Sequence, residues 1–384
     1  MTRFITHSMA IFLILINSSC DNNLSPEEHK QKRQSFSDLL SSKDISGYSR
    51  AITPRKMKFP EDYGPHPDFR NEWWYLTGNL TTDSGRHFGY QLTIFRLAMM
   101  PSANNDAQTE HQQGWHSSQL YMGHFALTDT QNNTHYDFEE INRTGAGLAG
   151  AEINPVNVWV NNWQLKSRDP EKLFPLSVTA LATSSNNKTI AIDLNLSSER
   201  GPVMHGNNGL SQKSNLPGNA SYYYSYTHMN TSGSIQTDAE TQEVNGLSWF
   251  DREWSTSSLS ETQAGWDWFA LQLDTGEDLM IYRMRLKDGD IDSIGTGTFI
   301  SQDGIQHQID IKDIDLKPEA TWLSESGAEY PVRWRLQLPA YWIDVGITAR
   351  VKDQEVKQTF QYWEGAVLVE GSHKGHGYVE LTGY

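Results

Sequence analysis

The sequence of 384 residues contains a single cysteine, Cys20, so no disulfide can form within the chain. It also lacks an excess of basic residues, because 31 Lys and Arg stand against 47 Asp and Glu. The resulting net charge of −16 argues against a nucleic-acid groove and against electrostatic docking to anionic lipid. Long runs of the helix-forming residues Ala, Leu, Glu and Lys are missing, which predicts few helices.

The chain also lacks an apolar run long enough to span a bilayer, which takes about 20 residues. Its most apolar stretch, residues 9–16, follows Arg3 and fits the central part of a secretory signal peptide. Two serines precede Cys20, an arrangement that resembles a bacterial lipobox. We therefore expect residues 1–20 to be a lipoprotein signal peptide with Cys20 as the lipidated residue. Ordinary signal-peptide cleavage nearby is the alternative.

Two features next to Cys20 bear on where the protein resides. Asp21 resembles an inner-membrane retention signal, and residues 21–58 are polar with mixed charge, which indicates a spacer. The expected location is the bacterial cell envelope, with a lipid anchor in the membrane and the folded part facing the periplasm.

From Phe59 onward, short alternating segments are separated by turn residues, and aromatic residues reach 11% of the chain. Such segments predict a series of β-strands in an all-β sandwich or barrel. Clear examples are residues 73–77, 87–96, 120–127 and 156–160.

Residues 201–219 are rich in Gly, Asn, Ser and Pro, so we expect a domain boundary near Gly218. This divides the chain into an N-terminal domain (59–217) and a C-terminal domain (218–384). An Asp/Gly hairpin between aromatic strands occurs once in each half, which indicates two related β domains.

The segment 244–254, Val-Asn-Gly-Leu-Ser-Trp-Phe-Asp-Arg-Glu-Trp, interleaves tryptophan with acids. Alternate side chains of a strand share a face, so Trp249, Asp251 and Glu253 would point to the same side. An indole with two carboxylates predicts the wall of an aromatic cavity that holds an acid. Burial against the indole would raise the pKa of that acid. The other face would carry Phe250, Arg252 and Trp254.

Three interpretations of Asp251 and Glu253 remain open at the level of sequence. As catalytic residues they could protonate an alkene, with aromatic faces stabilising the cation and a water molecule completing a hydration. The same cavity could bind an apolar ligand with no reaction. The structural alternative is an ion pair between one of these acids and Arg252, Arg283 or Arg285.

Further candidates for ligand contact come from other aromatic segments. Glu72 could face the cavity with Trp74, or pair with an arginine such as Arg96 on a neighbouring strand. A tyrosine face suits an amphiphilic ligand, or a core whose hydroxyls are satisfied internally. That face carries Tyr222, Tyr224, Tyr226 and His228, and the remaining candidates are Trp249, Trp266, Trp268 and His124.

The histidines show no standard metal-ligand spacing, and no phosphate-binding or dinucleotide-binding fingerprint occurs. We therefore expect no metal and no cofactor. The histidines considered are His111, His116, His124, His373 and His376.

Several segments, taken in order, resemble the AttH-like family, which is often labelled predicted secreted hydrolase and is related to the carotenoid hydratase hydroxyneurosporene synthase. The resemblance covers about residues 59–384 and implies two lipocalin-like β domains. In the hydratase branch the acid aligned with Asp251 is a proposed catalytic residue, whereas no Gly-x-Ser-x-Gly nucleophile elbow occurs here. The matching segments are residues 71–78, 246–254, 265–269, 362–365 and 377–384.

The sequence thus predicts a membrane-tethered, lipocalin-like protein that binds a hydrophobic or amphiphilic small molecule in an aromatic cavity. The first alternative is an enzyme acting on such a ligand, a hydratase or isomerase with Asp251 as general acid, or a hydrolase as the family label implies. The second alternative is an envelope interaction protein without a small ligand. No nucleic-acid partner is expected.

Overall fold

Two antiparallel β-sheets make up the fold of this chain in a computed structural model, which describes residues 45–102, 118–238, 240–256 and 259–384. All of these residues belong to one compact unit. Cys20, the predicted signal peptide, most of the predicted spacer, His111 and His116 lie outside the described residues. Within the described ranges, no helix has the length and apolar character needed to cross a membrane.

The larger sheet has 13 strands, which run in the order β4-β3-β2-β1-β13-β12-β9-β8-β7-β6-β5, with β10 and β11 paired to β12. Its strands are β1 (Asn71–Thr81), β2 (His87–Ala98), β3 (Gln119–Asp129), β4 (Thr134–Arg143), β5 (Ala149–Ile153), β6 (Val156–Val160), β7 (Trp163–Ser167), β8 (Leu176–Thr183), β9 (Thr189–Ser197), β10 (Val203–Met204), β11 (Leu210–Gln212), β12 (Ala220–Thr237) and β13 (Glu240–Ser255).

The smaller sheet has 10 strands in the order β17-β16-β15-β14-β23-β22-β20-β19-β18, with β21 paired to β22. Its strands are β14 (Gln263–Leu273), β15 (Asp278–Leu286), β16 (Ile291–Ile300), β17 (Gln306–Asp310), β18 (Asp315–Leu323), β19 (Glu329–Leu338), β20 (Ile343–Ala349), β21 (Glu355–Lys357), β22 (Gln361–Gly371) and β23 (Gly375–Leu381). The short 3₁₀ turns are η1 (Glu61–Tyr63), η3 (Ile311–Asp313) and η4 (Pro339–Tyr341).

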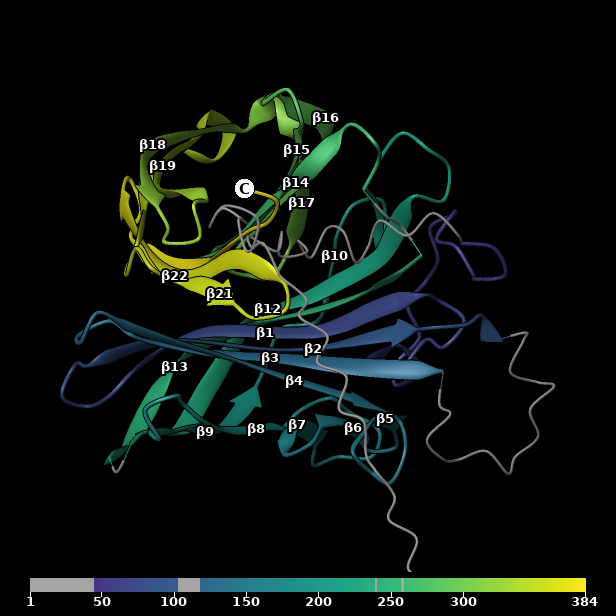
Figure 1. The fold of residues 1–384 in the computed structure, drawn as a ribbon. Coiled ribbons are helices and arrows are strands. Elements are labelled where there is room, and N and C mark those ends of the chain that lie inside the picture. Colours follow the sequence, from purple (N-terminus) through teal and green to yellow (C-terminus); the bar gives the residue numbers. More distant parts are fainter. Residues whose placement is uncertain (1–44, 103–117, 239, 257–258) are drawn as a thin grey trace, which may run out of the picture. The chain divides into compact units, whose positions relative to one another are not determined.

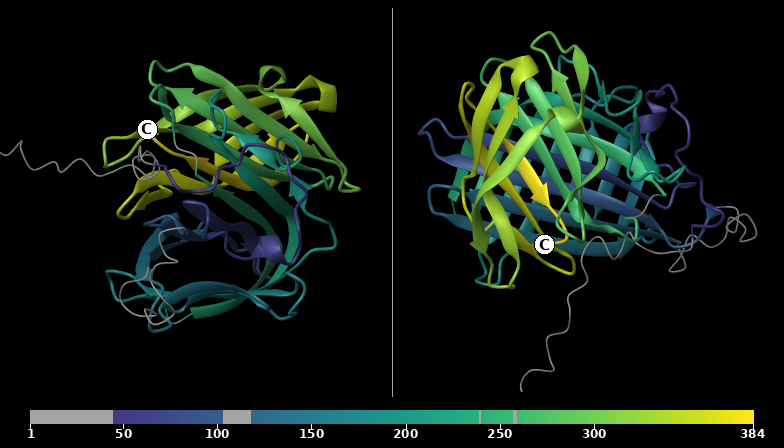
Figure 2. Two further views of the ribbon diagram at one scale, coloured as in Figure 1. Left: turned by 90° about the vertical axis from the view of Figure 1, so that its right-hand side faces the viewer. Right: turned by 90° about the horizontal axis from the view of Figure 1, so that it is seen from above.

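Each sheet curls around its own apolar core, so that the fold consists of two barrel-like halves (Figures 1 and 2). The predicted all-β class is confirmed. The chain passes from one sheet to the other between Ser255 and Gln263, whereas the predicted boundary near Gly218 precedes β12, a strand of the larger sheet. The Gly- and Asn-rich segment 201–219 carries β10 and β11, which fold back onto β12, and does not act as a linker.

The central strands of the larger sheet are buried on both faces, because one face packs into that sheet's own core and the other meets the smaller sheet. The approach is close at Gly89 in β2, where an added Cβ would lie 2.6 Å from the Cβ of Ala366 in β22. Hydrogen bonds also join the sheets, such as the one from Asn79 Nδ2 to the carbonyl oxygen of Gly377 at 3.1 Å. This contact region contains the cavity described below.

Candidate functional site

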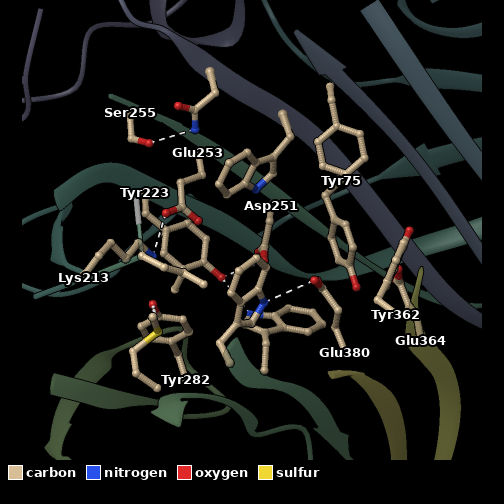
Figure 3. A pocket seen from close by; sticks show the side chains of 17 residues that line it. Tyr75, Lys213, Tyr223, Asp251, Glu253, Ser255, Tyr282, Tyr362, Glu364 and Glu380 are labelled. Carbon is tan, nitrogen blue, oxygen red and sulfur yellow. Dashed lines mark hydrogen bonds and ion pairs between the residues drawn. The ribbon is translucent and has the colours of Figure 1, made fainter. Parts of the chain in front are cut away.

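An aromatic cavity lies between the two sheets, and side chains of both sheets line it (Figure 3). The larger sheet contributes residues of β1, β2, β12 and β13, and the smaller sheet contributes residues of β14, β15, β22 and β23. Seven of the 17 lining side chains carry an indole or phenol ring. The ionisable side chains that line it, tyrosines apart, are four acids and one lysine: Asp251, Glu253, Glu364, Glu380 and Lys213.

The alternation of β13 places its acids at the cavity. Asp251 and Glu253 line it, while Phe250 and Trp254 belong to the apolar core of the larger sheet. The predicted division of this strand into two faces is therefore confirmed. Trp249 shares the face of the acids and packs edge-on against Trp268 with ring centroids 6.2 Å apart. It does not line the cavity itself, contrary to the expectation from the sequence.

Asp251 is 4% exposed and is held by neutral hydrogen-bond donors. Its Oδ2 accepts from the hydroxyl of Tyr223 at 2.6 Å, and its Oδ1 accepts from Trp249 Nε1 at 2.6 Å and from the Ser225 hydroxyl. Burial raises the pKa of Asp251 to about 7, although these three hydrogen bonds oppose the rise. A carboxyl with such a pKa exchanges protons readily near neutral pH.

A buried polar chain extends behind Asp251 and fixes its orientation. His205 Nε2 lies 2.6 Å from Ser225 Oγ, and His205 Nδ1 lies 2.9 Å from Thr298 Oγ1 in the smaller sheet. Burial lowers the pKa of His205 to about 3, so its imidazole is neutral. Since the Ser225 hydroxyl donates to Asp251, it accepts from His205, and the other ring nitrogen accepts from Thr298.

Glu253 has a cationic partner, unlike Asp251. The ammonium group of Lys213 lies 2.7 Å from Glu253 Oε1 and 4.2 Å from the centre of the Tyr282 ring. The sequence-based alternative, an ion pair with one of three arginines, is wrong for Glu253: Arg252 pairs with Glu72, and the other two arginines pair with Asp267. Lys213 follows β11 in the loop-rich segment, where no strand pattern pointed to the cavity.

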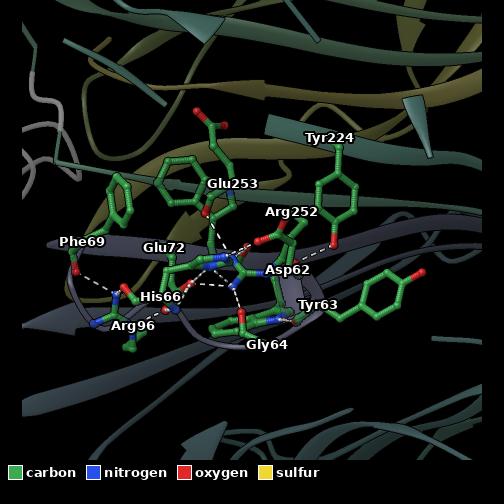
Figure 4. A network of polar contacts seen from close by, with 12 residues as sticks. Asp62, Tyr63, Gly64, His66, Phe69, Glu72, Arg96, Tyr224, Arg252 and Glu253 are labelled. Atoms are coloured by element: carbon green, nitrogen blue, oxygen red, sulfur yellow. Dashed lines mark hydrogen bonds and ion pairs between the residues drawn. The ribbon is translucent and has the colours of Figure 1, made fainter. Parts of the chain in front are cut away.

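Glu72 lies on the opposite face of the larger sheet, in a buried ionic network (Figure 4). Trp74 shares that face and belongs to the apolar core of the larger sheet. The carboxylate of Glu72 contacts Arg96 and Arg252, and it accepts the backbone N–H of His66 at 2.9 Å. The Arg252 guanidinium lies 3.8 Å from the centre of the Trp74 ring. Neither Glu72 nor Trp74 lines the cavity, so the alternative of a structural pair with Arg96 describes Glu72.

The network explains why these residues are charged although they are buried. Desolvation alone would raise the pKa of Glu72, but the charges of Arg96 and Arg252 hold it well below its usual range. Arg252 also donates to the carbonyl oxygen of Gly64, and Arg96 donates to those of His66 and Phe69 at 2.8 Å. The network thereby ties the segment around η1 to the sheet.

Tyr222 and Tyr224 also point into the core of the larger sheet. Their hydroxyls donate to backbone oxygens, that of Tyr222 to Thr53 and that of Tyr224 to Asp62, both at 3.0 Å. This matches the alternative of a core with internally satisfied hydroxyls. A β-bulge after Tyr226 turns His228 away from that face, and its Nδ1 lies 2.9 Å from Asp278 Oδ1.

Trp266 and Trp268 line the cavity, and Trp268 Nε1 donates to the Tyr223 hydroxyl at 3.0 Å. His124 does not line it, but His124 Nδ1 lies 2.7 Å from the hydroxyl oxygen of Tyr362, which does. His124 therefore positions a wall residue. No group of three His, Cys, Asp or Glu suited to a metal ion occurs among the residues that the structure describes.

Several cavity residues escaped sequence reasoning. Tyr223 belongs to a run of tyrosines in which either face of the strand could have been chosen, and Tyr75 sits in an equally aromatic strand. Glu364 and Glu380 occur within segments that carry the family resemblance, but nothing in the sequence shows that they are cross-strand partners. The other missed residues that carry a charge or a phenol ring are Lys213, Tyr282 and Tyr362.

Comparison with known proteins gives one family and two informative structures. The family model described as AttH-like matches residues 50–384. The crystal structure of a protein assigned as AttH from Nitrosomonas europaea is 32% identical, with a TM-score of 0.75, covering 88% of this chain and 99% of that one. The crystal structure of kievitone hydratase from Nectria haematococca is 15% identical, with a TM-score of 0.63, covering 88% of this chain and 96% of that one. No curated protein sequence matches the chain.

Proposed function

The chain belongs to the AttH-like family, and it shares its lipocalin-like fold with a hydratase. On this basis we propose that it binds a hydrophobic or amphiphilic small molecule in the aromatic cavity. We further propose that Asp251 exchanges a proton with that molecule. The reaction class is addition of water to a double bond, its reversal, or movement of the double bond. The proposal includes a lipid anchor at Cys20 that tethers the protein in the bacterial cell envelope, facing the periplasm.

The observation that carries the proposal is the environment of Asp251. It lines the cavity without a cationic partner among the described residues, and burial brings its pKa to about 7. A purely structural acid is expected to have its charge neutralised by an ion pair, as Glu72 and Glu253 do. Keeping a carboxyl near half-protonation at neutral pH instead supports general acid and base chemistry.

The wall of the cavity suits the rest of that chemistry. The faces of indole and phenol rings stabilise positive charge that develops on a protonated alkene, and Trp268 and Tyr282 lie at the wall with the acid. The likeness to kievitone hydratase concerns the fold alone. It means that at least one protein with this architecture is a hydratase.

The second candidate function is binding and transport of the same ligand without a reaction. The aromatic wall favours it as much as it favours catalysis, and the two functions differ only in whether the bound molecule changes. Substitution at Asp251 separates them, because the amide of asparagine has nearly the same size but cannot donate a proton to carbon.

The test begins with native mass spectrometry of the full chain, followed by lipid extraction of any molecule that co-purifies. The extract is then incubated with the wild type, with Asp251→Asn and with Asp129→Asn, which alters a buried aspartate outside the cavity. We expect conversion by the wild type and by Asp129→Asn, and retention of the ligand without conversion by Asp251→Asn. Conversion by Asp251→Asn at the wild-type rate would refute the catalytic role.

The anchor at Cys20 has its own test. Mass analysis of the N-terminal peptide from the membrane fraction is expected to show a diacylglycerol adduct on Cys20, and Cys20→Ser is expected to remove that adduct. A soluble protein with an unmodified N-terminus in the wild type would contradict this part of the proposal.

A further inference from the structure

A second pair of acids lies at the cavity, on the smaller sheet. Glu364 in β22 and Glu380 in β23 are directly opposite each other in the antiparallel register, and both line the cavity (Figure 3). Residues so placed have Cβ atoms about 4.5–5.5 Å apart. Both side chains therefore lie on the same face of the smaller sheet and within reach of a common ligand in the cavity.

Neither carboxyl forms an ion pair among the residues that the structure describes, although the charge of Lys213 acts to lower the pKa of Glu380. The nearby ammonium group of Lys213 pairs with Glu253, and the ion pairs of the described residues do not include Glu364 or Glu380. Glu380 accepts a hydrogen bond from Trp266 Nε1 at 3.2 Å. Two carboxylates in this position cannot both be charged at low cost.

Glu364 is the unusual member of the pair. It is 1% exposed, and neither of its oxygens makes a hydrogen bond of standard geometry, although the hydroxyls of Tyr75 and Tyr362 lie near enough to favour its charged form. The Tyr75 hydroxyl is likewise buried without a hydrogen bond of standard geometry. Buried polar atoms are normally satisfied by protein or water, and a small polar occupant at this wall would complete the hydrogen bonds that Glu364 and Tyr75 leave short of standard geometry.

The electrostatics of the pair agree with this geometry. Burial and the charge of Glu380 raise the pKa of Glu364 well above its usual range. Burial also raises the pKa of Glu380 to about 8, with Asp251 and Glu253 adding to the rise. The pair therefore loses its first proton slightly above neutral pH and holds the second one far longer, as coupled carboxyl groups do.

We propose that Glu364 and Glu380 form a proton-sharing carboxyl pair that binds a water molecule, or a hydroxyl group of the ligand, and accepts its proton. This inference rests on the proposed function of Asp251 and adds the second group that the reaction requires. The occupant sits against Glu364 and the Tyr75 hydroxyl, while Trp266 holds Glu380 in place.

In the direction of hydration, Asp251 transfers its proton to one alkene carbon, and the oxygen of the bound water forms a bond to the other. The water loses one proton to the carboxyl pair, so the alkene gains one hydrogen and one hydroxyl group and nothing is oxidised or reduced. Return of a proton from the pair to Asp251 through solvent restores the starting state. In dehydration the same groups exchange roles, as microscopic reversibility requires.

The sharing of a proton can be tested without a substrate. Infrared spectra of the full chain at about pH 10 are expected to show the carbonyl band of one buried, still protonated carboxyl group, because the pair resists a second ionisation. Glu364→Gln is expected to abolish this band, because the remaining Glu380 then ionises without a second carboxylate opposite it. Glu380→Gln is expected to make the band disappear at a lower pH than in the wild type, because Glu364 stays buried but no longer faces the charge of Glu380. Glu355→Gln alters a buried glutamate outside the cavity and is expected to leave the band unchanged.

Absence of the band from the wild type, its persistence in Glu364→Gln, or an unchanged titration of the band in Glu380→Gln would overturn the inference. A crystal structure of the full chain provides the second measurement, with an ordered oxygen atom expected between Glu364 and the Tyr75 hydroxyl. A dry site, or a metal cation at that position, would also overturn it. Because neither measurement involves turnover, the pair can be established even if Asp251→Asn shows that the catalytic proposal fails.

Discussion

Tyr223 donates a hydrogen bond from its hydroxyl to Oδ2 of Asp251 at 2.6 Å, and this bond stabilises the ionised form of the acid. The tyrosine lies in β12 and the acid in β13, so the contact depends on the pairing of these two strands. Trp268 in the smaller sheet completes the arrangement by donating to the same tyrosine oxygen. The ionisation of the central acid is thus controlled from both sheets.

Tyr223→Phe removes this donor and is expected to move the pKa of Asp251 above about 7. A hydrogen bond to a charged group contributes about 1.5–3 kcal/mol, which corresponds to about 1–2 pH units. Infrared titration of the carboxyl band measures the shift. Tyr222→Phe is the matched control, because its hydroxyl bonds to the backbone of Thr53 in the core. A pKa that stays the same in Tyr223→Phe would contradict this account of Asp251.

Asp251→Asn is expected to stabilise the fold in a pH-dependent manner. The pKa of Asp251 is raised from 3.8 to about 7 in the folded state. The protonated carboxyl therefore makes its full contribution to the free energy of unfolding below its unfolded pKa, and this contribution is lost as the pH rises through 7. The shift corresponds to at most about 4 kcal/mol, and the gain is smaller because the amide offers one acceptor oxygen fewer to the three donors.

Urea denaturation of wild type and Asp251→Asn between about pH 4 and pH 8 measures that contribution. The difference in unfolding free energy is expected to move in favour of the variant across this range and to level off above pH 7. A difference that does not change with pH would mean that Asp251 is not held near half-protonation in the folded protein.

The sequence was sufficient for the fold class and for one wall of the cavity. Alternation along β13 correctly separates Asp251 and Glu253 from Phe250 and Trp254, because a strand between two packed layers has two distinct faces. It could not tell which face of the larger sheet lines the cavity. Glu72 and Trp74 satisfy the same pattern as cavity residues, yet they belong to the core of the larger sheet.

The cavity residues that sequence reasoning missed depend on strand register. Glu364 and Glu380 are 16 positions apart in sequence and become neighbours only through the pairing of β22 with β23. Lys213 reaches Glu253 from a loop with no periodic pattern. His228 leaves the tyrosine face because of a β-bulge. Long-range pairing and bulges are set by the whole sheet, and a single local pattern does not contain them.

Lys213→Met is expected to destabilise the protein, because it leaves the carboxylate of Glu253 buried without its cation. Removing one partner of a buried pair costs about 3–5 kcal/mol, and the side chains of Lys213 and Glu253 are only 13% and 6% exposed. The double variant Lys213→Met/Glu253→Gln is expected to recover most of that loss in urea denaturation. Losses that add up in the double variant would show that the two residues do not interact.

Glu72→Gln distinguishes a structural role from the ligand contact that the sequence suggested. The pKa of Glu72 is held well below its usual range by Arg96 and Arg252, so its ionised form stabilises the fold above the unfolded pKa of about 4.5. This contribution is lost only as the pH falls through the folded pKa. We therefore expect a loss of about 3–5 kcal/mol at neutral pH, and a smaller loss in strong acid.

Two measurements on Glu72→Gln decide between these roles. Urea denaturation at neutral pH reports the stability. Native mass spectrometry of the folded variant, without urea, reports the amount of co-purifying ligand. A structural role predicts lower stability with an unchanged amount of ligand, since Glu72 lies on the face of β1 that is turned away from the cavity. Wild-type stability combined with loss of the ligand would instead place Glu72 in the binding site.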